Sequence, residues 1–165
     1  MPPVWRDHPN LRARFHPEFP DDLQVIAHDK GPDGWSRQAE LLWVRVTGCE
    51  GEVFSGVVLN QPQQLREVSL GSAILFIIPK GGDHLIQVTN EYMQERPTWR
   101  LIMPCNKCGM TEVFDPPSQL VAATFPSVSA EQLSSGFTFT TRCPLCGGGM
   151  LLRLKRTQWP WSDSK

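Results

Sequence analysis

Four of the five cysteines of this chain stand in two short motifs of one design, Cys-x-x-Cys-Gly. The first motif supplies Cys105 and Cys108, and the second supplies Cys143 and Cys146. Zn²⁺ prefers four soft ligands in tetrahedral geometry, and a CxxC loop bends two thiolate sulfurs toward one point. The two motifs together therefore predict one zinc ion per chain, bound by these four cysteines.

A shell of four thiolates leaves no open position for water or substrate, which is typical of structural zinc rather than catalytic zinc. Two alternatives remain open for these cysteines. The first is a redox-active pair, because a CxxC pair can exchange disulfides when the pKa of one of its thiols is lowered at a helix N-terminus. The second is a set of four ordinary thiols that bind no ligand. The duplicated motif, flanked by strand-like residues, favours the metal. The fifth cysteine, Cys49, has no partner motif, and we expect no role for it.

Other chemistry is less well supported by the sequence. No GxSxG, P-loop, GxGxxG or HExxH motif is present, which removes several common enzyme classes. The adjacent residues Asp83 and His84 could form an acid–base pair, so an uncharacterised enzyme stays an alternative. A surface turn is the other interpretation of this pair.

The strongest basic feature is the segment with Arg153, Lys155 and Arg156, followed by Trp159. Zinc ribbons can place such a strand on nucleic acid, with aromatic rings stacked on bases. These four residues are therefore candidate nucleic-acid contacts. The alternative for them is an exposed strand with alternating charges.

Length and composition limit the classes of protein. A chain of 165 residues with 40% hydrophobic content is that of one folded domain or two small ones. Its formal net charge of −1 provides no overall attraction to nucleic acid or an anionic membrane surface. No apolar run approaches the ~20 residues of a membrane helix, and no secretory signal pattern begins the chain. We expect a cytoplasmic protein with reduced thiols.

Periodicity divides the chain into an arm, a sheet domain, a metal domain and a tail. Residues 1–40 are rich in proline and predict an extended arm, with a short strand at 23–28. Residues 41–97 predict a small barrel-like domain, because apolar residues alternate along short segments separated by turns. Residues 98–156 predict a zinc ribbon, and residues 157–165 an irregular tail.

The metal domain is expected to contain two hairpins with the CxxC loops at their tips. The strands lead into the loops at 99–103 and 137–141 and out of them at 111–114 and 150–154. Between the loops, Ser118 can cap a helix that runs to Ala123, and Ser129 with Gln132 forms a capping-box pattern. A further short helix is predicted at 91–96, after the N-cap residue Asn90.

One part of the chain resembles a known family. The residues concerned are Trp43-Val44-Arg45-Val46-Thr47-Gly48, then Gly51, Phe54, Gly56, Leu59-Asn60-Gln61-Pro62, Val68 and Gly71. Over about residues 41–80 they resemble a bacterial domain family of unknown function with the patterns W-V-x-V and G-x-L-x-N-x-P. The resemblance implies a bacterial origin and a small β fold. The CxxC loops depart from that family and look like a rubredoxin-like zinc ribbon.

These observations predict an α+β, mainly β protein: a small SH3-like or curled antiparallel sheet plus a four-cysteine zinc ribbon with a short helical insert. The closed metal site and the many aromatic residues favour a non-enzymatic bacterial binding protein, stabilised by zinc. Its expected partner is another protein, which it would serve as an adaptor or as an inhibitor of the immunity type. The alternatives are a nucleic-acid-binding zinc-ribbon protein and an enzyme that uses the β domain; a membrane partner is not expected.

Overall fold

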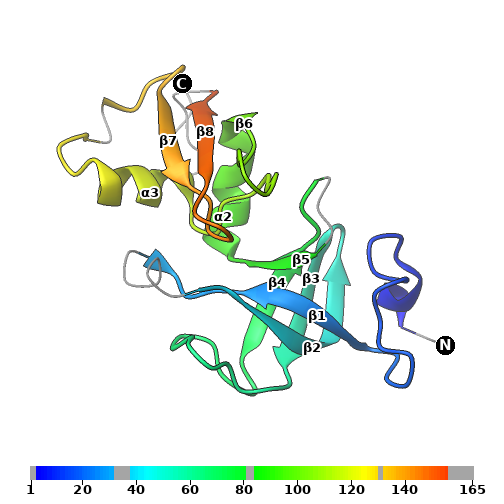
Figure 1. Ribbon diagram of the computed structural model, residues 1–165. Coiled ribbons are helices and arrows are strands. Elements are labelled where there is room, and N and C mark those ends of the chain that lie inside the picture. Colours follow the sequence, from blue (N-terminus) through cyan, green and yellow to red (C-terminus); the bar gives the residue numbers. More distant parts are fainter. Residues whose placement is uncertain (1–2, 32–37, 81–83, 130–131, 156–165) are drawn as a thin grey trace. The chain divides into compact units, whose positions relative to one another are not determined.

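The computed structural model describes residues 3–31, 38–80, 84–129 and 132–155. The chain forms two compact units, Met1–Thr89 (unit 1) and Asn90–Lys165 (unit 2). Over the whole described chain strand outweighs helix, so the predicted mainly β class is confirmed at this level, although unit 2 combines a small sheet with helices (Figure 1).

Unit 1 is a closed barrel of five short strands (Figure 1). After the short 3₁₀ helix η1 (Val4–Asp7), the strands are β1 (Asp22–Ala27), β2 (Glu40–Glu50), β3 (Val53–Val58), β4 (Ala73–Ile77) and β5 (Leu85–Val88). Consecutive strands pair antiparallel, and β1 closes the barrel by pairing parallel to β5. A closed sheet leaves no unpaired edge strand.

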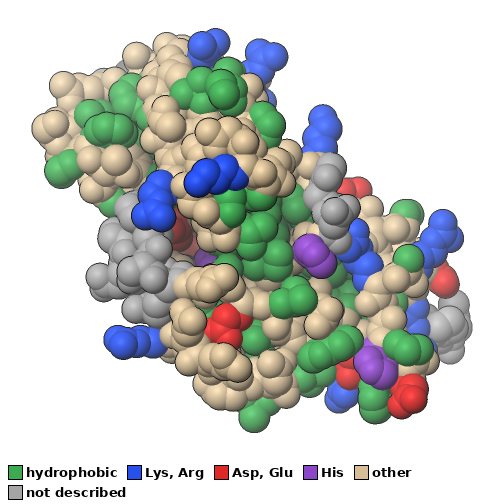
Figure 2. All heavy atoms as spheres, viewed as in Figure 1, with side chains coloured by type: hydrophobic (Ala, Val, Ile, Leu, Met, Phe, Trp, Pro, Cys, Tyr) green, Lys and Arg blue, Asp and Glu red, His purple; other side chains and the backbone are tan. Residues whose placement is uncertain are grey.

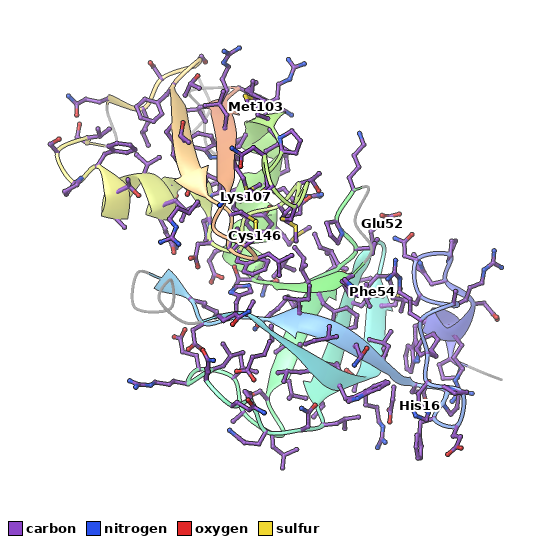
Figure 3. The ribbon with its side chains drawn as sticks, in the orientation of Figure 1. His16, Glu52, Phe54, Met103, Lys107 and Cys146 are labelled. Carbon is purple, nitrogen blue, oxygen red and sulfur yellow. The ribbon has the colours of Figure 1, made fainter. Side chains whose placement is uncertain are left out.

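The barrel interior follows from the period-2 pattern of the sequence. Along β2 the side chains of Leu42, Val44 and Val46 are buried, while their neighbours face outward. Phe54 and Phe76 belong to this core, with ring centroids 5.6 Å apart and neither side chain exposed. Figure 3 labels Phe54 on β3. The alternation predicted for this segment is therefore present and builds one apolar core.

The predicted arm over residues 1–40 is wrong in part, because β1 lies within it and is a full member of the barrel. Its apolar residues pair with the start of β2, for example Val25 opposite Leu42. Without this strand β2 and β5 would each keep an open edge, so closure of the barrel explains the difference. The prediction of a short strand at 23–28 was the correct signal.

The connection between β2 and β3 is a two-residue turn. Strand β2 continues to Glu50 and only Gly51 and Glu52 connect it to β3, with Glu50 opposite Val53. Gly51 has a φ of 64°, a conformation that favours glycine. A register shift between Val46 and Gly48 marks a bulge that lets the long strand bend.

Unit 2 contains a three-stranded sheet in the order β6-β8-β7 and two short α-helices. Its elements are α2 (Asn90–Glu95), the 3₁₀ helix η2 (Arg96–Thr98), β6 (Trp99–Met103), α3 (Pro117–Thr124), β7 (Thr138–Arg142) and β8 (Gly149–Leu154). On the buried face of the sheet, Trp99 and Phe139 form an edge-to-face pair with ring centroids 5.4 Å apart. The helices expected at 91–96 and 118–123 are present within a residue or two.

Two expectations for this part of the chain are corrected. Only the second loop joins a hairpin, β7 to β8; the residues 111–114 after the first loop form no strand, and β6 pairs with β8 instead. Glu112 of this segment is buried and accepts hydrogen bonds from Tyr92 and Arg96, so the segment contacts α2 and η2 through this side chain. Helix α2 belongs to unit 2 and not to the barrel, so the division falls at Thr89 rather than at residue 97.

The net charge near zero conceals a difference between the units. Residues 1–89 carry eight Lys and Arg against eleven Asp and Glu, whereas residues 90–165 carry eight against six. Unit 1 therefore has a formal charge of −3 and unit 2 of +2. Figure 2 shows Lys and Arg side chains in blue on the visible surface of unit 2.

Candidate metal centre

The first CxxCG loop is a tight turn closed by its own backbone. The amide of Cys105 donates to the carbonyl of Met110 at 3.0 Å, and the amide of Gly109 donates back to the carbonyl of Cys105 at 3.0 Å. Gly109 has a φ of 78°, which explains why glycine follows the second cysteine. The loop directs Cys105 and Cys108 to the same side.

The second loop repeats this arrangement bond for bond. The amide of Cys143 donates to the carbonyl of Gly148 at 2.6 Å, and the amide of Gly147 donates to the carbonyl of Cys143 at 2.9 Å. Gly147 has a φ of 81°. The repeated sequence motif is thus a repeated three-dimensional turn.

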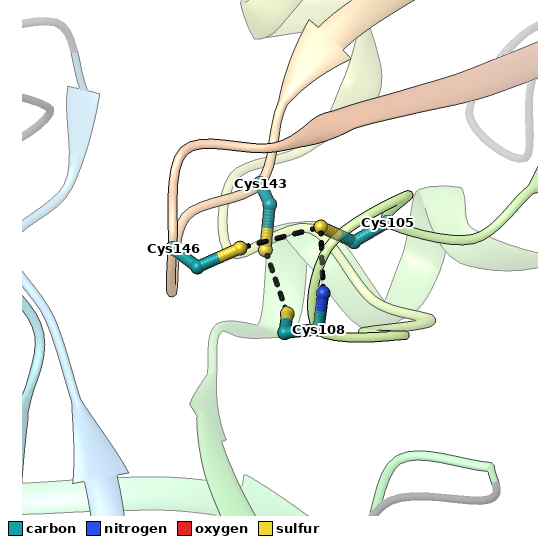
Figure 4. A group of neighbouring side chains, drawn as sticks. All are labelled: Cys105, Cys108, Cys143 and Cys146. Carbon is teal, nitrogen blue, oxygen red and sulfur yellow. Dashed lines mark hydrogen bonds between the residues drawn. The ribbon is translucent and has the colours of Figure 1, made fainter.

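The two loops bring the four sulfurs of Cys105, Cys108, Cys143 and Cys146 within 4.8 Å of one another. The Sγ atoms of Cys105 and Cys146 are 3.3 Å apart, and those of Cys108 and Cys143 are 3.6 Å apart (Figure 4). Tetrahedral zinc with bonds of about 2.3 Å needs sulfurs about 3.8 Å apart. The sulfur cluster therefore has nearly the size that one tetrahedral metal ion requires.

Backbone amides point at two of the sulfurs. The amides of Lys107 and Cys108 donate to the Sγ of Cys105, each at 3.4 Å, and the amide of Leu145 donates to the Sγ of Cys143 at 3.4 Å. Such amide donors stabilise thiolate ligands and orient them toward a metal.

The pKa values of the thiols show how much negative charge the cluster tolerates without a cation. Burial opposes ionisation of Cys105, but the amides of Cys108 and Lys107 outweigh it and lower the pKa of this thiol to about 6. Burial raises the pKa of Cys143 to about 12 and also raises the pKa of Cys108. Four adjacent thiolates at neutral pH therefore require a bound cation.

Hydrogen bonds between Asn106 and Gly149 join the two loops. The amide of Asn106 donates to the carbonyl of Gly149 at 3.1 Å, and its side-chain oxygen accepts from the Gly149 amide at 3.0 Å. A Cβ atom at Gly148 would lie 2.5 Å from the Sγ of Cys105. Glycine is thus required at Gly148 because the second loop approaches the first so closely. Figure 3 labels one residue of each loop, Lys107 of the first and Cys146 of the second.

Sequence reasoning missed the buried carboxylate of Glu95, which holds α2 to the rest of unit 2. Glu95 is 1% exposed, and it accepts from the indole of Trp99 at 2.9 Å and from the hydroxyl of Ser118 at 2.6 Å. Burial raises its pKa despite these donors. Ser118, predicted as a cap, therefore bonds a distant helix instead. Nothing in a short polar helix marks one Glu as buried, so the sequence carried no signal for it.

The remaining predicted residues lie apart from the sulfur cluster or outside the described part of the chain. Cys49 is half-buried in β2, where its thiol donates to the carbonyl of Gly51 at 3.5 Å. His84 is exposed directly before β5, and Asp83 lies outside the described residues. Of the candidate nucleic-acid contacts, Arg153 and Lys155 are exposed on and after β8. Arg156 and Trp159 are not among the described residues.

The fold and site define a two-unit β protein with a four-cysteine cluster able to bind a metal ion. Comparison with protein families, curated proteins and solved structures gives no match to this chain. The resemblance of residues 41–80 to a bacterial domain family accordingly stays a prediction. No helix in the described ranges is long and apolar enough to cross a membrane.

Proposed function

We propose that this chain is a non-enzymatic binding protein whose second unit is stabilised by structural zinc. The main observation in support of this proposal is the cluster of four cysteine sulfurs within 4.8 Å of one another. Because all four positions of a tetrahedral ion are taken by protein sulfur, the metal holds the loops together and does not reach a substrate. Zinc and iron both suit four thiolates, and a structural role without redox chemistry favours zinc.

The finer architecture belongs to the same proposal. The repeated turns and glycines of the two CxxCG loops support a rubredoxin-like zinc ribbon with the helical insert α3. The five short strands of unit 1, closed around one apolar core, support an SH3-like barrel. Both folds serve as binding modules in many unrelated proteins, so function must come from their surfaces.

Unit 1 supplies a surface suited to a protein partner. Phe19 is 51% exposed and Leu41 is 44% exposed. The ring of His16 lies 5.0 Å from that of Phe19 and 5.3 Å from that of Trp43, which follows Leu41 on the outward face of β2. Exposed aromatic and aliphatic side chains gathered in this way are typical of protein–protein contact surfaces. This patch supports an adaptor or an inhibitor of the immunity type, acting in the bacterial cytoplasm.

The test is to identify a stoichiometric protein partner and to map its contact. Tagged, zinc-loaded full chain is used for capture from the source cells after nuclease treatment, and the candidate partner is then purified and mixed with the chain. We expect a defined complex by size-exclusion chromatography, weakened by Phe19→Ser with Leu41→Ser and unchanged by Val4→Ser. Loss of all capture on nuclease treatment, or no complex between the purified proteins, would contradict the proposal.

Nucleic-acid binding is the second candidate, favoured by the positive charge of unit 2. Arg153 and Lys155 are exposed and could contact phosphates. Such binding would weaken steeply with salt and would fall uniformly across sequences on Lys155→Gln. Failure of the chain to bind heparin at low salt would remove this candidate.

A further inference from the structure

The outward face of the sheet in unit 2 carries a row of cations. Arg100 of β6 lies directly opposite Arg153 of β8, and Arg153 lies opposite Thr138 of β7. The Nε of Arg153 donates to the hydroxyl of Thr138 at 3.2 Å, and all three residues are exposed. Within the described ranges neither arginine forms an ion pair with a carboxylate.

A pair of like charges directly opposite each other destabilises a sheet. The opposed side chains of Arg100 and Arg153 therefore repel each other and destabilise the sheet. An anionic group bound between them would remove this repulsion. Because guanidinium groups bind carboxylates through two parallel hydrogen bonds, carboxylates suit this position well.

The next rows along the strands add apolar and cationic side chains to the same face. Met103 lies opposite Leu151, and Met103 is 51% exposed. One row further, Arg142 stands opposite Gly149. We name this surface, formed by Arg100, Arg153, Met103, Leu151 and Arg142, the basic sheet face. Since alternate residues of a strand are about 6.6 Å apart, cationic, apolar and cationic rows follow at that spacing.

Within its described residues, the rest of unit 2 does not neutralise this surface. Glu95, Glu112 and Asp115 are buried, and Glu91 is the one exposed acidic residue within the described part of unit 2. Five cations of the same part are exposed: Arg100, Lys107, Arg142, Arg153 and Lys155. Figure 2 shows cationic side chains beside hydrophobic ones on the visible surface of this unit. The local potential therefore favours an acidic partner.

The composition of the basic sheet face favours an acidic polypeptide over nucleic acid. Single-stranded nucleic acid is commonly bound by aromatic rings that stack on its bases. In this sheet Trp99 and Phe139 point into the core and are 5% and 4% exposed. The exposed apolar residues of the face are Met103 and the half-buried Leu151, which suit aliphatic side chains of a protein.

We infer that the basic sheet face docks an acidic segment of a partner protein that carries apolar side chains between its carboxylates. An extended segment with acidic and apolar residues alternating on one of its faces matches the row spacing. The inference rests on the proposed protein-binding function and adds the surface and the chemistry of the partner.

The test measures binding of labelled peptides to the zinc-loaded full chain by fluorescence anisotropy at low salt. The first probe repeats Glu-Thr-Leu-Thr, which places Glu and Leu on one face of an extended chain. The second repeats Lys-Thr-Leu-Thr, and the third is an oligothymidylate strand. We expect the Glu peptide to bind and the Lys peptide not to bind, with the oligothymidylate weaker than the Glu peptide.

Matched variants locate the binding. Arg100→Gln combined with Arg153→Gln should weaken the Glu peptide by about tenfold, because two cations that face its carboxylates are removed. Arg12→Gln combined with Arg66→Gln changes the charge equally on exposed residues of unit 1 and should alter affinity less than about twofold. Met103→Gln keeps all charges and should weaken the peptide by a few-fold. Zinc content and thermal unfolding establish that each variant is folded.

Three results would overturn the inference. They are no binding of the Glu peptide, equal effects of the two double variants, and tighter binding of the oligothymidylate with the same loss in the Arg100 and Arg153 variant. The last result would establish nucleic acid as the ligand of this face. Failure here, while a purified partner still binds the chain through Phe19 and Leu41, would reject the docking surface but leave the protein-binding proposal standing.

Discussion

The barrel of unit 1 and the sheet of unit 2 are held together by different means. In unit 1 five strands form a ring with no free edge, and Phe54 and Phe76 fill the interior. In the described part of unit 2 three strands pair, and β6 and β7 are the outer strands of the sheet. The cysteine loops at one end of this sheet supply the connection that the barrel obtains from hydrogen bonds and apolar packing.

This difference indicates which interactions stabilise each unit and which surfaces remain for function. Unit 1 depends on burial of apolar side chains, so its outward faces can vary without loss of the fold. Unit 2 buries three carboxylates, Glu95, Glu112 and Asp115, and holds opposed arginines on its surface. A strongly bound metal can offset such costs, because its binding free energy is also folding free energy.

Removal of the metal should show the largest difference between the two units, because only unit 2 is expected to unfold. Structural zinc sites of this class contribute about 10–16 kcal/mol of apparent binding free energy, so strong chelation should unfold unit 2 and leave the barrel folded. Cys105→Ser and Cys143→Ser should have the same effect. Amide NMR spectra of the full chain would show loss of dispersed signals from residues 90–155 alone. Equal loss from residues 22–88 would contradict independent closure of the units.

Truncation within the barrel core should give the reverse result. Phe54→Ala removes a fully buried ring and should lower the free energy of unfolding of unit 1 by about 3–5 kcal/mol. Urea unfolding followed by NMR checks this, with zinc content expected to stay unchanged. Phe54→Leu is the milder control. A loss of zinc in Phe54→Ala would show that unit 2 depends on the barrel.

The close approach of the two loops can be tested without touching a cysteine. Gly148→Ala places a Cβ atom 2.5 Å from the Sγ of Cys105 and 2.9 Å from the Oδ1 of Asn106. We expect zinc affinity to fall by about 10–100-fold, as for other changes beside metal ligands. Competition with a chromophoric chelator measures the affinity. Gly149→Ala is the control, since its Cβ atom would lie 3.8 Å from the Asn106 side-chain amide nitrogen, an ordinary van der Waals distance.

A smaller, pH-dependent effect is expected at Glu40, beside the loop from β3 to β4. Burial raises the pKa of Glu40, but amide donors from Gln63, Gln64 and Leu65 outweigh it and lower the pKa below its ordinary value of 4.5. A lowered pKa contributes stability to unit 1 above pH about 4.5, and that stability is lost as the pH falls through the folded-state pKa. Glu40→Gln should therefore cost about 1 kcal/mol at neutral pH and less in acid. An equal cost at both pH values in urea unfolding would argue against this role of the charge.

The sequence predicted the clustering of the four cysteines because the signal for it is local. Each CxxCG loop contains its cysteines, its glycine and its closing hydrogen bonds within six residues, so spacing alone indicated that Cys105 and Cys143 belong to matching turns. The alternation in β2 was likewise visible along one segment.

Features that depend on distant partners were not visible. Strand β1 lies among prolines and becomes a barrel strand only through β2 and β5. The burial of Glu95 depends on Trp99 and Ser118, and the pairing of Arg100 with Arg153 depends on the register of β6 against β8. Periodicity along the chain carries no information about such register, and for this reason the basic sheet face emerged only from the structure.

We propose that one metal ion with four sulfur ligands holds unit 2 together. X-ray absorption at the zinc edge of the purified full chain, combined with metal analysis, tests it most directly. We expect one zinc per chain with four sulfur neighbours at about 2.3 Å. Protein kept under reducing conditions that contains no metal, or zinc with nitrogen or oxygen ligands in place of cysteine sulfur, would contradict it.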